Sequence, residues 1–126
     1  MKKQVISTAH APAAIGPYSQ AIETDSFVFT SGQIPINPKS GKIEADTIEE
    51  QAEQVMQNLK AVLAQAGVGM DRIVKTTCFL ADLGDFAAFN AVYGKYFPEA
   101  APARSCFAVA ALPMGAKLEV ECIAVK

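Results

Sequence analysis

The stretch from residue 47 to residue 66 places the strongest constraint on the fold, because it predicts one long amphipathic helix. Thr47 and Glu50 have the spacing of a helix-capping box, and Gly67 suits the left-handed conformation that often ends a helix. Apolar residues recur at steps of three and four, which places them along one helical face. This face consists of Ile48, Ala52, Val55, Met56, Leu59, Val62, Leu63 and Ala66. A helix of this kind has to pack its apolar face against a second layer.

The rest of the chain predicts strands and a second helix around this element. Aromatic side chains recur on one side of a helix over residues 85–97, and the prolines and glycine of residues 11–18 predict a fixed, non-helical loop. Strands are predicted at residues 26–31, 42–44, 72–80, 104–111 and 116–125. The order ββαβαββ is typical of an α+β fold with two helices on one face of a mixed or antiparallel β-sheet. No linker or repeat interrupts the 126 residues, so we expect one domain over residues 1–126.

The last predicted strand is apolar on both of its faces. Leu118, Val120 and Cys122 fall in one alternation class, while Ile123 and Val125 fall in the other. Two helices can cover only one face of a sheet, so the other face requires a second cover. Another copy of the same chain would supply it, which indicates a homo-oligomer.

The charge and cysteine pattern argues against several classes of partner. The net charge is −2 and the only adjacent basic pair is Lys2-Lys3, which argues against nucleic-acid binding. No apolar run is long enough to span a membrane, and the first ten residues lack the apolar core of a signal peptide. Three widely spaced cysteines and a single histidine do not form a metal-binding pattern. Free thiols favour a reducing compartment, and we expect a cytoplasmic protein.

Arg104 is the first candidate for a functional residue, because it opens an otherwise apolar strand. A guanidinium is always charged, so beside a core it needs an anionic partner. One interpretation is a fork that holds a ligand carboxylate through two parallel hydrogen bonds. The other is a structural salt bridge to Glu119 or Glu121 on the last strand. The residues alone leave both interpretations open.

Three ionisable side chains lie on or beside the same predicted strands. Glu119 and Glu121 are two residues apart and therefore point to one face, where either could act as a general acid or base. Their alternative role is a solvated face, or ion pairing with Lys117 or Arg104. Cys106 lies two residues after Arg104 on the same side of its strand, so the guanidinium could lower the pKa of the thiol. A nucleophilic cysteine usually also needs a base, and a buried structural thiol is the alternative.

Polar positions in other segments complete the set of candidates. Tyr18 follows a restricted Gly-Pro pair and could line a pocket with its ring and hydroxyl, or simply pack against its neighbours. Ser31 and Gly32, at a strand end, could offer N–H and hydroxyl groups to an anion, or form a plain turn. Asn90 lies inside the second helix, where asparagine is a poor helix former, which indicates a specific hydrogen bond. None of these positions identifies a function by itself.

Six segments form a pattern that covers nearly the whole chain. The two most specific are Ala-Pro-Ala-Ala-Ile-Gly-Pro-Tyr-Ser-Gln at residues 11–20 and Pro-Ala-Arg-Ser-Cys at residues 102–106. The others are Thr-Ser-Gly-Gln-Ile-Pro at 30–35, Val-Lys-Thr-Thr at 74–77, Phe-Asn-Ala-Val-Tyr at 89–93 and Leu-Glu-Val-Glu at 118–121. In this content and order the chain resembles the RidA/YjgF/UK114 family of reactive intermediate deaminases.

The resemblance implies a fold, an assembly and a reaction. The fold would be chorismate-mutase-like, of the bacillus type, and the assembly a homotrimer with sites at subunit interfaces. The reaction would convert short 2-imino acids, such as 2-iminobutanoate and 2-iminopropanoate, into 2-keto acids and ammonia without a cofactor or metal. Arg104 would hold the substrate carboxylate and Glu119 would position or activate water. The backbone at Cys106 would contact the imine end, and the pocket would be lined by Tyr18, Ser31, Gly32 and Asn90.

Two rival functions stay open beside this one. A pocket containing Arg104 could bind a keto acid and act as a regulatory module without turnover, or Cys106 could support a thiol-dependent hydrolysis. The chain departs from the family pattern at Phe107-Ala108, often Val-Glu, and at Met114-Gly115, often Lys-Asp. Both departures lie outside the matched motifs, so they bear on substrate preference more than on the chemistry.

Overall fold

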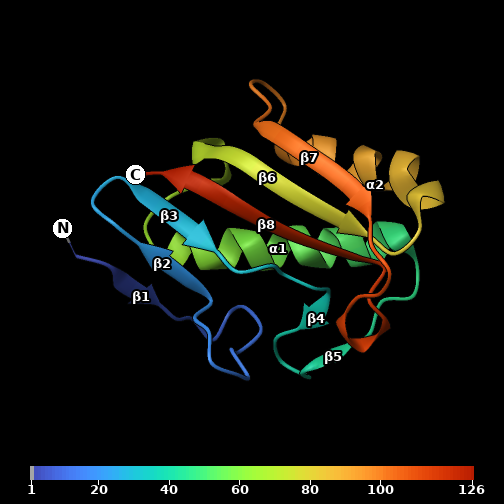
Figure 1. Ribbon diagram of the computed structural model, residues 1–126, viewed down its shortest axis with the longest axis horizontal. Coiled ribbons are helices and arrows are strands. Elements are labelled where there is room, and N and C mark those ends of the chain that lie inside the picture. The colour runs from blue at the N-terminus through green and yellow to red at the C-terminus, as the bar shows by residue number, and fades with distance from the viewer. Residues whose placement is uncertain (1) are drawn as a thin grey trace.

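The computed structural model describes residues 2–126 and consists of a six-stranded sheet with two helices packed on one face (Figure 1). The order across the sheet is β1-β2-β3-β8-β6-β7, and only the β6–β7 pair is parallel. The strands of this sheet are β1 (Gln4–Ile6), β2 (Ala21–Glu23), β3 (Phe27–Thr30), β6 (Ile73–Leu80), β7 (Ala103–Ala108) and β8 (Leu118–Val125). The expected α+β class, with a mixed sheet and a chorismate-mutase-like fold, is confirmed.

The long helix α1 (Ile48–Gln65) forms where the apolar pattern predicts it. The Thr47 hydroxyl oxygen accepts a hydrogen bond from the Glu50 N–H, and Gly67 ends the helix region with a φ of +79°. Seven of the eight residues of its apolar face are buried, Val55 and Leu59 completely, while Ala66 is partly buried. Among residues 2–126, no helix combines the length and the apolar character that a membrane crossing requires.

The strands differ from the sequence prediction at both ends of the chain. Five strands precede α1 instead of two, since β1 and β2 are three-residue strands too short to give a pattern, and β4 (Ile36–Asn37) pairs with β5 (Lys42–Ile43) in a separate small sheet. The last two strands, β7 and β8, are consecutive in the chain but do not pair with each other, because β6 lies between them. The helix α2 (Phe86–Tyr93) is the crossover that a parallel β6–β7 pair requires.

The two faces of the sheet have different covers. On β8 the helix-facing side chains of Leu118, Val120 and Cys122 are buried. The opposite face carries three phenylalanines that are 40–46% exposed, Phe27, Phe29 and Phe107. The sequence pattern therefore identified a real apolar surface that one chain leaves uncovered. The homotrimer that would cover it stays a prediction.

Candidate functional site

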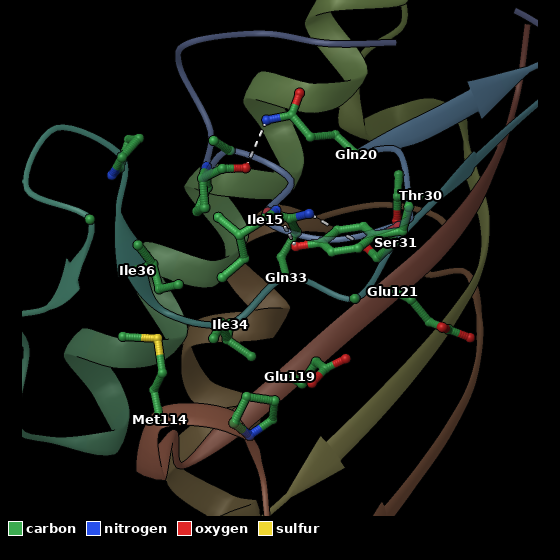
Figure 2. Close-up of a pocket in the computed structure, with 17 residues that line it drawn as sticks. Ile15, Gln20, Thr30, Ser31, Gln33, Ile34, Ile36, Met114, Glu119 and Glu121 are labelled. Carbon is green, nitrogen blue, oxygen red and sulfur yellow. Dashed lines mark hydrogen bonds between the residues drawn. The ribbon is translucent and has the colours of Figure 1, made fainter. Parts of the chain in front are cut away.

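A cavity of about 830 Å³ opens beside the start of β8 and contains four of the predicted site residues (Figure 2). Its walls come from the N-terminal loop, from the segment after β3 and from the loop before β8. The predicted residues in its lining are Tyr18, Ser31, Gly32 and Glu119. Because Glu121 also lines this cavity, we call it the acidic pocket.

A two-bond backbone bridge brings Gly32 against Glu119. Gln33 N–H donates to the Val120 carbonyl at 2.8 Å, and Val120 N–H donates to the Gln33 carbonyl at 3.1 Å. A Cβ at position 32 would lie 2.7 Å from Cδ and 2.9 Å from Cγ of Glu119, inside contact distance. Gly32 is therefore required for space beneath the carboxylate.

Among residues 2–126, the Ser31-Gly32 pair leaves only one of its suggested donors free, the Gly32 N–H. The Ser31 hydroxyl donates to the Ser19 carbonyl at 2.6 Å, and the Ser31 N–H donates to the Gln20 carbonyl at 2.9 Å. Both Ser31 donors are thus engaged in holding the loop, and the expectation that they face an anion is wrong. Within residues 2–126 the Gly32 N–H has no hydrogen-bond partner, so it is the donor at this corner that is free for a ligand.

The N-terminal wall of the pocket is fixed by one buried side chain. Gln20 is 3% exposed, and its amide donates to the carbonyls of Thr8 and Pro12 at 3.0 and 2.8 Å. Its side-chain oxygen accepts from the Thr8 N–H at 2.7 Å. These bonds hold the non-helical loop that the prolines predict, and Tyr18 lines the pocket from this loop with half of its surface exposed.

The surroundings of the Glu119 carboxyl group oppose its ionisation. Burial and, second, the nearby charge of Glu121 raise the pKa of Glu119 above its ordinary value. Within residues 2–126 the only ion pair joins Lys126 to Glu23, so neither pocket glutamate has a cationic partner. The alternative in which Lys117 or Arg104 neutralises them is therefore wrong for this chain.

Arg104 lies in a second group of residues, under the helix α2. Its Nη1 donates to Asn90 Oδ1 at 2.7 Å, which explains the asparagine inside that helix. The guanidinium Cζ stands 4.7 Å from the ring centroid of Tyr93 and 5.4 Å from that of Phe86. No carboxylate of residues 2–126 pairs with this half-buried cation. Its remaining donors are available to an anionic ligand.

The acidic pocket and Arg104 lie on opposite faces of the sheet. Arg104 pairs in register with Thr76, which in turn pairs with Cys122 on the helix-facing side. Glu119 pairs with Phe79 on the other side, and β6 separates the two strands. A salt bridge between Arg104 and the pocket glutamates is excluded by this topology. The two groups of predicted residues do not meet within one chain.

Cys106 belongs with Arg104 and is not activated by it. The thiol pairs in register with Cys78 on the helix-facing side, two residues along from Arg104. Burial raises the pKa of Cys106, and the lowering influence of Arg104 is smaller. The thiol is thus a poor thiolate nucleophile. We call Asn90, Arg104 and Cys106 the arginine cluster; none of them lines the acidic pocket.

The sequence did not reveal what holds the guanidinium in place. The Tyr93 hydroxyl and the Thr76 hydroxyl are 2.7 Å apart and buried, and the Tyr93 ring lies beneath Arg104. Aromatic residues at 86, 89 and 93 read as one packing side of a helix, and that side also supports the arginine. In the sequence, the spacing Phe-x-x-Phe-Asn-x-x-Tyr at residues 86–93 is the pattern from which this support of Arg104 could have been predicted.

Gly32→Ala should lower activity with little loss of stability. The added methyl group displaces the Glu119 side chain, which we predict to be a reacting group, and misplacement of such a group by about 1 Å lowers turnover up to about a hundredfold. Gly94→Ala is the matched control, since Gly94 has a helical φ of −61° and open space around its Cβ. Turnover and melting temperature of both variants check this. Unchanged turnover in Gly32→Ala would show that the close approach has no functional role.

The chain is similar in sequence to a known protein family and to several of its members. A family model described as endoribonuclease L-PSP matches residues 8–126. Reactive Intermediate Deaminase A, chloroplastic, from Arabidopsis thaliana is 51% identical over 124 residues, which are 98% of this chain and 66% of that protein, so the chain spans just under two thirds of that relative. A RutC family protein from Synechocystis is 53% identical, with 99% of this chain and 98% of that protein covered.

Solved structures share the fold closely. YyfA of the conserved Rid protein family from Yersinia pestis superposes with a TM-score of 0.96 at 48% identity, covering 99% of this chain and 100% of that chain. TdcF from E. coli, solved with bound serine, has a TM-score of 0.93 at 47% identity and covers 98% of each chain. At this identity the likeness extends beyond the fold to the sequence of the whole chain.

Proposed function

Because the chain belongs to the RidA/YjgF family, to which the endoribonuclease L-PSP model corresponds, we propose that it is an imine deaminase that hydrolyses 2-iminobutanoate and 2-iminopropanoate. Water adds to the imine carbon and forms a C–O bond. The nitrogen gains protons, the C–N bond breaks, and the products are a 2-keto acid and ammonia. No electrons are transferred to or from the substrate, so the reaction needs only orientation and proton transfer.

The observation that carries this proposal is the half-buried Arg104 guanidinium, which has no carboxylate partner among residues 2–126. Held by Asn90 and by the Tyr93 ring, its fork is oriented before a ligand arrives, which suits a planar carboxylate. Glu119 supplies the proton transfer: its ionised form takes a proton from water, and the resulting acid returns it to the leaving nitrogen. The bound serine in the E. coli relative's structure is a small carboxylate of comparable size.

A complete site requires a second copy of the chain. The acidic pocket and the arginine cluster lie on opposite faces of one sheet, so one substrate cannot touch both within a chain. The uncovered phenylalanine-rich face supplies an apolar surface for association. We propose a homotrimer in which the arginine cluster of one subunit meets the acidic pocket of the next. Sedimentation equilibrium at micromolar concentration tests this, and a stable monomer would contradict it.

Cleavage of RNA is the activity that the family description names, and the charges of this chain disfavour it. The net charge is −2, and two unpaired glutamates line the pocket, where they would repel a phosphate backbone. A keto-acid-binding regulatory module is compatible with the same arginine cluster. Turnover separates it from the deaminase.

One coupled assay tests the proposal. A threonine dehydratase generates 2-iminobutanoate in situ, and the decay of the imine is timed with and without the protein. We expect a faster decay with stoichiometric release of 2-ketobutyrate and ammonia. Binding of 2-ketobutyrate without faster decay would favour the regulatory module, and cleavage of an RNA substrate in a parallel arm would favour the endoribonuclease.

Glu121→Gln should move the acid limb of the pH–rate profile to lower pH. In the parent, burial and the Glu121 charge raise the pKa of Glu119, so the ionised base is lost as pH falls through a value above the ordinary carboxyl range. Removing the second of these causes lowers that pKa. The profile of kcat/KM between pH 4 and 8 measures the shift, with Glu99→Gln, a distant exposed position, as control. If the acid limb of the profile stays at the same pH in Glu121→Gln, ionisation of Glu119 does not determine that limb.

A further inference from the structure

The acidic pocket has a second, apolar part that imine hydrolysis itself does not use. Its lining includes the side chains of Ile15, Ile34, Ile36 and Met114. Figure 2 shows these four toward one side of the pocket in that view, with Ser31, Glu119 and Glu121 toward the other. We call these four residues the apolar wall. A pocket with reacting groups at one end and an apolar surface at the other discriminates by side chain.

Met114 adopts a backbone conformation that has to be maintained by its surroundings. It is the only non-glycine residue of residues 2–126 with a positive φ, at +58°, and the following Gly115 has a φ of +67°. Its side chain is 56% exposed yet lines the pocket. A strained and exposed apolar residue at the mouth of a pocket contributes little to folding, which points to a role toward a ligand.

The segment of the apolar wall that carries Ile34 and Ile36 is held in place by one buried side chain. Asn58 is 1% exposed, and its amide donates to the carbonyls of Ile34 and Ile36 at 3.1 and 3.0 Å. Its side-chain oxygen accepts from Gln54 at 2.9 Å, so the buried group is fully engaged. The segment that carries both isoleucines is therefore anchored to α1, and it presents a fixed apolar surface rather than a mobile loop.

We infer that the apolar wall, which includes Met114, makes this protein prefer 2-imino acids with long apolar side chains over 2-iminopropanoate. The inference rests on the proposed function and specifies its substrate class. A cavity of about 830 Å³ is of the size that holds far larger ligands than a four-carbon acid, and four apolar side chains line one part of it. Each methylene group taken out of water against this wall contributes roughly fourfold to kcat/KM.

The test compares two imines that are generated in the same way. An L-amino-acid oxidase with catalase generates the imine from leucine or from alanine, and trapping of the imine with semicarbazide reports its decay. In the parent, we expect kcat/KM for the leucine-derived imine to exceed that for the alanine-derived imine about tenfold or more. Met114→Lys should reduce this ratio about fivefold, mainly through the leucine-derived substrate. Leu83→Lys, 55% exposed and outside the pocket, is the matched control and should leave the ratio unchanged.

The outcomes separate this inference from the proposed function. Hydrolysis of both imines with equal kcat/KM, or an unchanged ratio in Met114→Lys, would overturn the substrate preference and leave the deaminase intact. No acceleration with either imine would contradict the proposed function itself. Ile34→Ala serves as a second variant. It enlarges the apolar part of the pocket and should lower the ratio of kcat/KM for the leucine-derived imine to that for the alanine-derived imine. A loss of kcat/KM with the alanine-derived imine alone would show that Ile34 does not contact the substrate side chain.

Discussion

Replacement of Arg104 by alanine should lower kcat/KM for 2-iminobutanoate at least about a hundredfold. In the proposed reaction the guanidinium fork would donate two charge-assisted hydrogen bonds to the substrate carboxylate, each of roughly 1.5–3 kcal/mol. The loss acts on binding and on orientation together, so both KM and kcat change. The fold should survive, because Arg104 has no ion pair within the described chain and its one side-chain hydrogen bond is to Asn90.

Two matched variants sharpen this result. Arg104→Lys keeps the charge and loses the fork, so it should recover only part of the activity. Arg72→Ala removes the other arginine, whose side chain donates to the backbone of Lys126, and should leave activity unchanged. Titration of each variant with 2-ketobutyrate measures product binding. If Arg104→Ala binds 2-ketobutyrate as tightly as the parent, the arginine does not hold the carboxylate.

Glu119→Gln should lower kcat by about 10²- to 10⁴-fold while product binding persists, because glutamine keeps the shape of the side chain and cannot exchange a proton. It should also raise the melting temperature at neutral pH. Burial and the charge of Glu121 oppose ionisation of this carboxyl group in the folded protein, and the uncharged amide removes that opposition. Such a gain in stability on loss of a catalytic group is the usual trade-off between activity and stability.

The gain in melting temperature of Glu119→Gln over the parent should be larger at neutral pH than at acidic pH. The folded-state pKa of Glu119 is raised, so the contribution of this group to stability is present below the unfolded-state pKa and is lost as pH rises through the folded-state value. The difference in melting temperature between Glu119→Gln and the parent should therefore be present at pH 7.5 and shrink at pH 4. Glu99→Gln provides the control. An equal difference at both pH values would mean that ionisation is not its cause.

The sequence predicted the layers of the fold because its strongest patterns are long. The eighteen residues of α1 carry enough apolar repeats to define a buried face, and β6 and β8 are eight residues each. The three-residue strands β1 and β2 are too short for alternation to be read. The position of β7 beside β6 is a matter of pairing between distant segments, which no local pattern encodes.

The same distinction applies to the candidate site. Chemistry-bearing residues could be picked out one by one, because Arg104 and Asn90 are unusual in their local surroundings. Their partners could not: the sequence offered Glu119 as a possible counter-ion for Arg104, and only the register shows that the two face opposite sides of the sheet. The support of Arg104 by Tyr93 and the close approach of Glu119 to Gly32 likewise follow from tertiary contacts.

In the proposed assembly, one site combines the arginine cluster of one subunit with the acidic pocket of another. It is tested most directly by co-assembly of Arg104→Ala and Glu119→Gln chains, refolded together in equal amounts. Each variant alone should be nearly inactive, and random mixing should restore up to about one quarter of the parent activity, because that share of interfaces pairs an intact Arg104 with an intact Glu119. Co-assembly of Arg104→Ala with Asn90→Ala, which damages the same cluster twice, should restore nothing. If the mixture of Arg104→Ala and Glu119→Gln also stays inactive while mixed trimers form, the two clusters do not build one site across subunits, and the account is contradicted.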